Sequence, residues 1–327
     1  MICHFSSHSK ASYNRTWAPI MNMIASEMSR RGYMLTKDAE LLWNNGPEFG
    51  NGMGRVPDVV IYTNCNKAVT PQRGLYVGLQ GPMPGYFSID SVGVWPHLEQ
   101  TYTNPSIPYV KGTKDYNLAL VNNIKKNKIN HYNNKNLNLG TESPEITDCP
   151  DDHVLLIMNV GDMLWTNTWT RFANIVNNLL TYDQKVVVKF EPEITLDNAG
   201  KVDEIKKQNM ETLFKQFEGH VTCYWGNESL HDILPKTKVC IMDDLVYNLE
   251  PFMYDVPIIT HMAPPYRHAV KQIYHEHELI HAVNNICEWY DADKQRAWFN
   301  WYVTSYLCKD EDSIRRRLED SLEFPSS

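Results

Sequence analysis

The sequence lacks several features that would place the protein in a membrane, outside a cell or on nucleic acid. No stretch reaches the roughly 18 consecutive apolar residues of a membrane-spanning helix. The start, MICHFSSHSKASYNRTW, lacks the charged beginning and long apolar core of a signal peptide. The 7 cysteines are odd in number and form no CxxC pair, which favours reduced, buried thiols. The net charge of −8 gives no global attraction to nucleic acid, although a local basic groove would still fit.

The composition is that of an ordinary globular protein. Of the 327 residues, 43% are hydrophobic and 21% are charged, and the length suits two domains. No internal repeat is visible. The polar stretch from 136 to 152, with two prolines, predicts the boundary. We therefore expect a cytoplasmic protein with domains at 1–150 and 151–300.

The most informative stretch runs from 228 to 260. It predicts a short helix at 229–235, a buried strand at 238–242, a helix at 245–254 and a strand at 257–260. Strands that alternate with helices this closely predict a parallel sheet. In such sheets, ligands bind outside the carboxyl ends of the strands. The polar residues found there are Asp243, Asp244, Tyr247, Asn248 and Glu250.

This stretch resembles the donor-binding half of GT-B glycosyltransferases, especially the group that includes capsule-polysaccharide and glycerophosphate transferases. The resemblance rests on residues 229–235 (SLHDILP), Glu250 and residues 255–259 (DVPII). It covers roughly the second half of the chain. It implies an α/β GT-B fold, in which two Rossmann-like domains face a cleft and the C-terminal helices, here 301–327, cross back to the first domain. It also implies that Glu250 holds the ribose hydroxyls of a nucleotide-sugar. The pair Asp243–Asp244 departs from the family, which often has Ser or Thr there.

Further donor-site candidates follow other predicted strands. Gly161 follows the strand at 154–158 and would let the backbone approach a ligand. Lys189 ends the strand at 185–190, where the family has a basic strand end; it either neutralises a donor phosphate or faces solvent. The predicted donor-binding residues are Gly161, Lys189, Glu191, Ser229, Leu230, Asp243, Asp244, Tyr247, Asn248, Glu250 and Arg267.

Catalytic and acceptor-binding candidates come from the first domain. Residues 80–90 are dense in glycine and proline, which predicts a rigid loop that presents Asp90. A carboxylate held in this way suits a general base, although aspartate also caps turns. The polar loop from 6 to 16 joins a first strand to the helix at 17–30, at a carboxyl edge. It is either part of the site or a solvated loop. The predicted acceptor-binding residues are His8, Ser9, Lys10, Asn14, Arg15 and His97.

Three other patterns leave alternatives open. Residues 125–135 hold lysines among asparagines and either contact phosphates or form a solvated linker. Residues 277–281 match HExxH, the helical zinc-protease motif, but the surrounding α/β order favours a packing helix. The aromatic residues between 298 and 306 favour a buried helix that holds the C-terminus on the first domain.

The resulting functional hypothesis is glycosyl transfer from a nucleotide-sugar, most simply a UDP-sugar, to a hydroxyl. No tightly bound cofactor is expected; a divalent metal is allowed for but not required, and no metal ligands are assigned. The preferred acceptor is a hydroxymethylpyrimidine base in phage DNA, because the chain is similar in size to phage DNA glucosyltransferases, which work in the host cytoplasm. The alternatives are a capsule or cell-surface polysaccharide acceptor, a nucleotide-sugar epimerase and a non-catalytic nucleotide-sugar binder.

Overall fold

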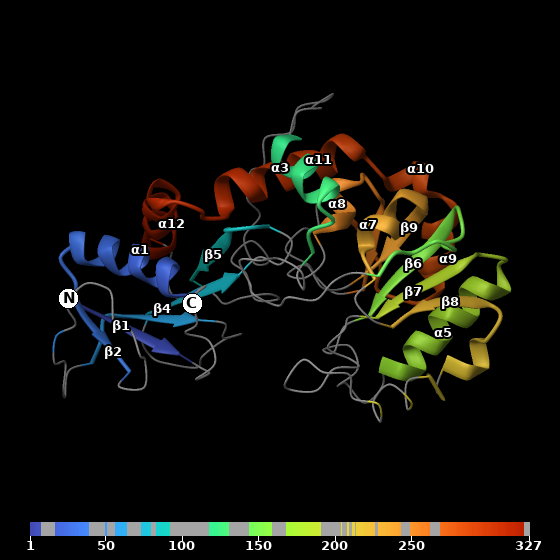
Figure 1. Cartoon of the computed structure of the whole chain (residues 1–327), viewed down its shortest axis with the longest axis horizontal. Helices are drawn as coiled ribbons and strands as arrows, with labels where there is room; N and C mark the ends of the chain where they lie inside the picture. Colours follow the sequence, from blue (N-terminus) through green and yellow to red (C-terminus); the bar gives the residue numbers. More distant parts are fainter. Residues whose placement is uncertain are drawn as a thin grey trace.

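The computed structural model of the chain describes residues 1–7, 17–38, 50, 56–63, 73–79, 83–91, 118–130, 144–158, 168–190, 204, 208, 211–212, 214–225, 228–242, 249–261 and 269–323. These residues form two α/β units, and helices near the C-terminus run from the second unit to the first (Figure 1).

The first unit is a five-stranded sheet in the order β2-β1-β3-β4-β5. Its strands run parallel except β5, which is antiparallel to β4. The strands are runs rich in β-branched and aromatic residues, which suit a pleated, buried surface. The elements of this unit are β1 (Ile2–Ser7), α1 (Trp17–Arg30), β2 (Met34–Lys37), β3 (Val59–Thr63), β4 (Arg73–Leu79) and β5 (Phe87–Asp90).

Helix α1 covers one face of this sheet. Its buried residues Ile20, Ile24 and Met28 recur every four positions, so they lie on one side of the helix. Gly32 ends the turn after the helix with a φ of +83°, and its N–H donates to the carbonyl of Ser29 at 2.9 Å. A residue without a Cβ adopts this left-handed conformation readily. The predicted helix and its glycine stop are confirmed.

The second unit is a six-stranded sheet in the order β11-β10-β9-β6-β7-β8, and every pairing in it is parallel. This confirms the parallel sheet predicted around 228–260. The strands are β6 (His153–Met158), β7 (Val186–Phe190), β8 (Val221–Tyr224), β9 (Thr237–Ile241), β10 (Ile258–Thr260) and β11 (Lys271–Gln272). The helices are α3 (Leu118–Lys126), α5 (Thr168–Thr181), η3 (Lys215–Phe217), α7 (Leu230–Ile233), η4 (Leu234–Lys236), α8 (Glu250–Met253), α9 (His277–Asn284), α10 (Ile286–Trp289) and α11 (Ala292–Trp301).

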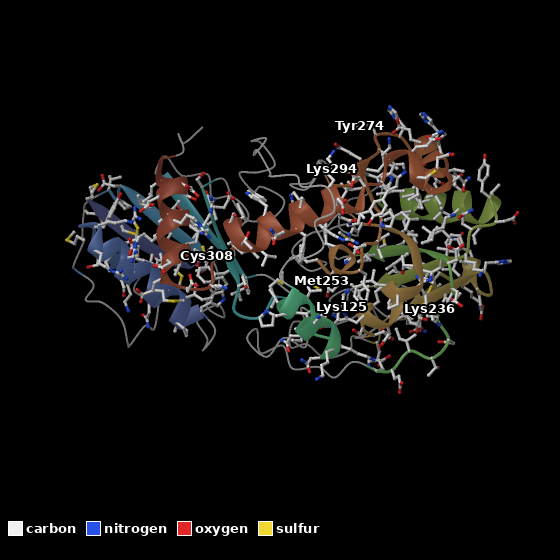
Figure 2. The ribbon with its side chains drawn as sticks, turned by 90° about the horizontal axis from the view of Figure 1, so that it is seen from above. Lys125, Lys236, Met253, Tyr274, Lys294 and Cys308 are labelled. Carbon is white, nitrogen blue, oxygen red and sulfur yellow. The ribbon has the colours of Figure 1, made fainter. Side chains whose placement is uncertain are left out.

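Alternate residues of the second sheet point into two separate cores. In β6, Leu156 packs on the side of α5 and α9, whereas Leu155 packs on the side of α7, α8 and α11. Helix α3 joins this latter core through Val121 and Ile124, although it precedes position 150 in the sequence. Figure 2 shows α3, marked by Lys125, beside α8, marked by Met253.

The C-terminal helices cross back to the first unit. Helix α11 continues into a π-helix, η5 (Tyr302–Tyr306), and then into α12 (Glu311–Glu323), which packs on α1 and β5 (Figure 1). Between them, Cys308 forms a bridge with Phe87 of β5 through N–H to carbonyl distances of 2.7 and 2.9 Å. Cys308 lies between α12 and the first sheet in Figure 2. Two Rossmann-like units and a returning C-terminal helix confirm the predicted GT-B fold class.

One predicted loop is wrong. Residues 87–90, assigned to the loop at 80–90, form strand β5 in a hairpin with β4. In the described part of the connection, Gly85 has a φ of +78°. After it, Phe87 and Ile89 alternate with Ser88 and point into the first core, so burial of these side chains stabilises a strand. Strand β2 is a further element that the sequence patterns did not predict.

Four of the described cysteines are buried and free, as the odd number and spacing of the cysteines predicted. Among the residues described, Cys3, Cys149, Cys240 and Cys308 are buried free thiols. Burial raises the pKa of Cys240, so this thiol stays protonated. None of the described helices is both long enough and apolar enough to cross a bilayer.

Candidate functional site

Strand order fixes where a ligand would bind on the second sheet. Counted in chain order, β6 to β8 extend to one side and β9 to β11 to the other, which is the Rossmann order. The order reverses between the neighbours β6 and β9. In such sheets, ligands bind in the crevice outside the carboxyl ends of the strands at this reversal. The predicted donor residues that follow strands but lie outside the described residues are Gly161, Glu191, Asp243, Asp244, Tyr247, Asn248 and Arg267.

Glu250 is a predicted donor residue that the structure describes close to this edge. It begins α8, the helix that follows β9, and its side chain is fully buried. Burial, and then the negative charge of Glu250, raise the pKa of Tyr254 to about 12. The oxygens of a carboxyl group accept hydrogen bonds. Glu250 therefore places hydrogen-bond acceptors beside the crevice.

Lys189 lies at the carboxyl end of β7, next to β6. It is 3% exposed and faces the same side of the sheet as Val187, which is the side of α7 and α8. Its Nζ donates to the carbonyl of Phe190 at 2.6 Å and lies 4.0 Å from a carboxylate oxygen of Glu228. A solvent-facing lysine is thus excluded, and its contact with a phosphate stays a prediction.

Ser229 and Leu230 have structural roles in the short helix α7. The hydroxyl of Ser229 caps this helix and accepts the N–H of His231 at 3.2 Å. Leu230 is buried in the core with Ile233 and Phe252. Their contact with a donor stays a prediction.

His231 connects three elements, a role that the sequence patterns did not predict. Its Nε2 donates to the carbonyl of Ile129 at 2.7 Å, and its Nδ1 lies 3.0 Å from the hydroxyl of Tyr254. A carbonyl only accepts hydrogen bonds, so the neutral ring carries its proton on Nε2. His231 thereby ties α7 to α8 and to the segment after α3. The SLHDILP motif contains this histidine, but nothing in the motif names its partners.

We expect His231 to make the protein less stable in acid. Burial lowers the pKa of His231, while the carbonyl of Ile129 and the charge of Asp232 oppose this effect. Above pH about 6.5 the ring is neutral in both the folded and the unfolded chain, so it adds no pH dependence to stability. Below this pH the unfolded chain binds a proton before the folded chain does, so acid favours unfolding. Urea unfolding at pH 7.5 and 5.5 should show a larger loss of stability for the wild type than for His231→Gln. The control His275→Gln changes an exposed histidine and should lose as much stability between the two pH values as the wild type does. An equal loss in His231→Gln and His275→Gln would contradict this role of His231.

Asp90 ends β5 and is fully buried. Its carboxylate accepts a hydrogen bond from the hydroxyl of Tyr306, in the π-helix. The guanidinium of Arg317 lies 4.7 Å from the ring centroid of Tyr306 and donates to the carbonyl of Ile89 at 3.0 and 3.1 Å. Asp90 thus sits where the first sheet meets the returning C-terminal helices. Its role as a base stays a prediction.

The first sheet also has a point at which its strand order reverses. It has the flavodoxin-like order, and the reversal lies between the neighbours β1 and β3. The predicted acceptor residues His8, Ser9, Lys10, Asn14, Arg15 and His97 lie outside the described residues.

Two lysines of the basic stretch bind within the chain. The Nζ of Lys125 lies 4.2 Å from the ring centroid of Tyr254, and the Nζ of Lys128 lies 2.7 Å from a carboxylate oxygen of Asp232. Burial lowers the pKa of Lys125, and the charge of Asp255 opposes this. These two lysines help to attach the α3 segment to the second unit. Contact of the basic stretch with phosphates stays a prediction.

The HExxH segment is a packing helix. Leu279 and Val283 of α9 are buried, and Glu278 accepts the N–H groups of Tyr274 and His275 at 2.7 and 3.0 Å. These bonds lower the pKa of Glu278. Within the part of the chain that the structure describes, no three metal-ligating side chains form a group. The hydrogen bonds of Glu278 therefore hold the backbone just before the helix.

Comparisons with known proteins find similar solved structures of low sequence identity. No protein-family model matches the sequence, and no curated protein matches it. Similar solved structures include KpsC from Thermosulfurimonas dismutans, as a β Kdo 2,4 transferase and as a β Kdo 2,7 transferase. The β Kdo 2,4 transferase has 13% identity over 91% of this chain and 89% of that chain, with a TM-score of 0.46. The β Kdo 2,7 transferase has 10% identity over 84% of each chain, with a TM-score of 0.40. A UDP-GlcNAc 2-epimerase from Methanocaldococcus jannaschii, in complex with UDP-GlcNAc and UDP, has 13% identity over 98% of this chain and 99% of that chain, with a TM-score of 0.39.

Proposed function

We propose that the protein is a glycosyltransferase that moves a sugar from a nucleotide-sugar, most simply a UDP-sugar, to a hydroxyl. The observation that carries this proposal is the position of Glu250. A buried carboxylate begins the helix that follows β9, and β9 borders the strand-order reversal of a Rossmann-type sheet. The two hydroxyls of a ribose can each donate a hydrogen bond to such a carboxylate. The GT-B resemblance of residues 229–259 assigns Glu250 the same partner.

The chemistry needs a base on the acceptor side and charge stabilisation on the donor side. Asp90 removes the proton of the acceptor hydroxyl. The oxygen of that hydroxyl attacks C1 of the sugar. The bond from C1 to the diphosphate breaks, and the leaving nucleotide carries the growing negative charge. Lys189 and the backbone amides beside the crevice stabilise this charge. Because these groups are already oriented, little reorganisation is needed during the reaction. Arg267 is proposed to assist them.

The direct test is incubation of the purified protein with a panel of UDP-sugars and two kinds of acceptor. Transfer to hydroxymethylpyrimidine DNA would appear as a sugar-sized mass gain on the digested nucleoside. Transfer to an oligosaccharide of capsule type would appear as a mass gain on that acceptor. An epimer formed from the donor alone would favour the epimerase alternative, and saturable UDP binding without turnover would favour a binding protein. Absence of both binding and turnover would contradict the proposal.

The contacts of the basic stretch bear on the choice of acceptor. A DNA acceptor was predicted partly from the lysines at 125–135, yet Lys125 and Lys128 bind Tyr254 and Asp232. A capsule or cell-surface polysaccharide needs no such basic surface. The assay therefore includes both kinds of acceptor.

Glu250→Gln should weaken UDP binding with little effect on folding. Hydrogen bonds to a charged group contribute about 1.5–3 kcal/mol, so we expect the Kd for UDP to rise about tenfold or more. The amide has a similar shape but carries no charge. Titration calorimetry with UDP measures the change, and Glu288→Gln, an exposed position in the same unit, is the matched control. An unchanged Kd would remove Glu250 from the donor site.

A further inference from the structure

A column of stacked rings runs from the donor-side helix to the first sheet. We call Phe252, Trp298, Tyr302 and Tyr306 the aromatic column. The ring centroids of Phe252 and Trp298 lie 4.8 Å apart, those of Trp298 and Tyr302 lie 4.9 Å apart, and those of Tyr302 and Tyr306 lie 5.2 Å apart. The last two pairs are stacked within 18°. All four side chains are buried, so a shift of one ring displaces the next.

The two ends of the aromatic column touch the two halves of the proposed site. Phe252 lies in α8, two positions after Glu250. At the other end, the hydroxyl of Tyr306 donates to Asp90 of β5, and Arg317 covers its ring. Phe87, in the same strand, is bridged to Cys308. The column therefore connects a donor-side group to the strand that carries the proposed base.

Both ends are also held in place by polar contacts. Near α8, Arg296 of α11 binds both carboxylate oxygens of Asp255 at 2.5 and 2.8 Å, which fixes α11 to the turn after α8. Near β5, where the column ends in the π-helix, Arg317 of α12 donates to the carbonyl of Ile89 at 3.0 and 3.1 Å, which fixes α12 to β5. The column is thus clamped at both ends.

We propose that Tyr306 is a positioning residue that couples α8 to the first sheet through the aromatic column. A nucleotide bound beside Glu250 orders α8, and the column passes this ordering to β5 and Asp90. By thermodynamic reciprocity, a change at the Tyr306–Asp90 contact alters the response of the first sheet to the nucleotide. The inference rests on the proposed function only for the identity of the ligand.

Hydrogen exchange measured by mass spectrometry tests this coupling, with UDP as the probe. In the wild type, UDP should slow exchange at 249–256 and also at 83–91, a segment that contains strand β5 of the first unit. Tyr306→Phe keeps the ring in the column and removes only the hydroxyl. In this variant, UDP should still slow exchange at 249–256, but the slowing at 83–91 should be lost. A merely structural tyrosine would change the basal exchange around 306 and leave the response to UDP intact.

The control is Tyr33→Phe, which removes a tyrosine hydroxyl from the first unit outside the column and should keep the response to UDP at 83–91. The same response in Tyr306→Phe as in the wild type, or a wild-type response confined to 249–256, would overturn the coupling. Exchange without UDP supplies a second comparison, in which Tyr306→Phe should speed exchange at both 83–91 and 249–256. No speeding at 249–256 would also overturn the coupling. Failure of UDP to protect any segment would contradict the proposed function, and the comparison without UDP would still judge the coupling.

Discussion

Trp298→Ala is expected to lower the free energy of unfolding by about 3–5 kcal/mol, the usual cost of removing a large buried aromatic side chain. Trp298 is 1% exposed and contacts the rings of both Phe252 and Tyr302. The substitution removes contact area from both neighbours and leaves a cavity in the core that joins α8 to α11. Because domains are stable by only about 5–15 kcal/mol, this one change would consume a large part of the total. Urea unfolding monitored by circular dichroism measures it.

Two further variants interpret the Trp298 result. Trp298→Phe keeps a ring in the column and should lose less stability than Trp298→Ala. Tyr274→Ala changes a side chain that is 70% exposed and should alter stability by no more than about 0.5 kcal/mol. If Trp298→Ala lost no more stability than Tyr274→Ala, the aromatic column would not be a major source of stability.

Asp90→Asn should lower kcat by a factor of about 10²–10⁴, the usual contribution of a general base, and leave the Kd for UDP unchanged. The asparagine oxygen can still accept the hydrogen bond from Tyr306, so the contact with the C-terminal helices is kept. The loss would therefore come from the missing carboxylate. Initial rates with the acceptor found in the transfer assay measure kcat, and calorimetry measures the Kd for UDP.

Comparison with Tyr306→Phe separates the two roles of Asp90. Tyr306→Phe keeps the carboxylate and removes the hydrogen bond, whereas Asp90→Asn does the reverse. A base predicts the larger loss of kcat in Asp90→Asn, and a purely structural anchor predicts the larger loss in Tyr306→Phe. Asp58→Asn is the control, because Asp58 accepts the N–H of Ile2 at 2.6 Å in the same unit and has no assigned role in transfer.

Elements with a strong local pattern could be predicted from the sequence. Helix α1 was predicted with both its ends, because its apolar residues recur at helical spacing and a glycine follows. Strand β9 was predicted because an apolar run precedes the pair Asp243–Asp244. Strand β5 was missed because Gly85 and its neighbours suggested a loop, while the tendency to form a strand came from pairing with β4 and from burial against α12. Such burial depends on residues far away in the sequence.

The candidate site was predictable where it follows from topology and not where it depends on distant partners. The carboxyl edge of the second sheet, with Glu250 beside it, followed from alternating strands and helices. The bond between Tyr306 and Asp90 joins residues 216 positions apart, and no spacing rule connects them. His231 was part of a quoted motif, but its partner Ile129 lies 102 positions earlier. Polar contacts of this kind appear only once the chain has folded.

The bridge between Cys308 and Phe87 has a consequence for synthesis of the chain on the ribosome. Strand β5 is the edge of the first sheet, and Ile314 and Leu318 of α12 complete the core beneath it. Domains generally fold from the N-terminus as they emerge, at about 5–20 residues per second. Here the first unit emerges early but stays incomplete until the whole second unit and α12 have been translated. During that interval β5 lacks its bridge to Cys308, so the edge of the first sheet is exposed to pairing with other chains until the last helix is made.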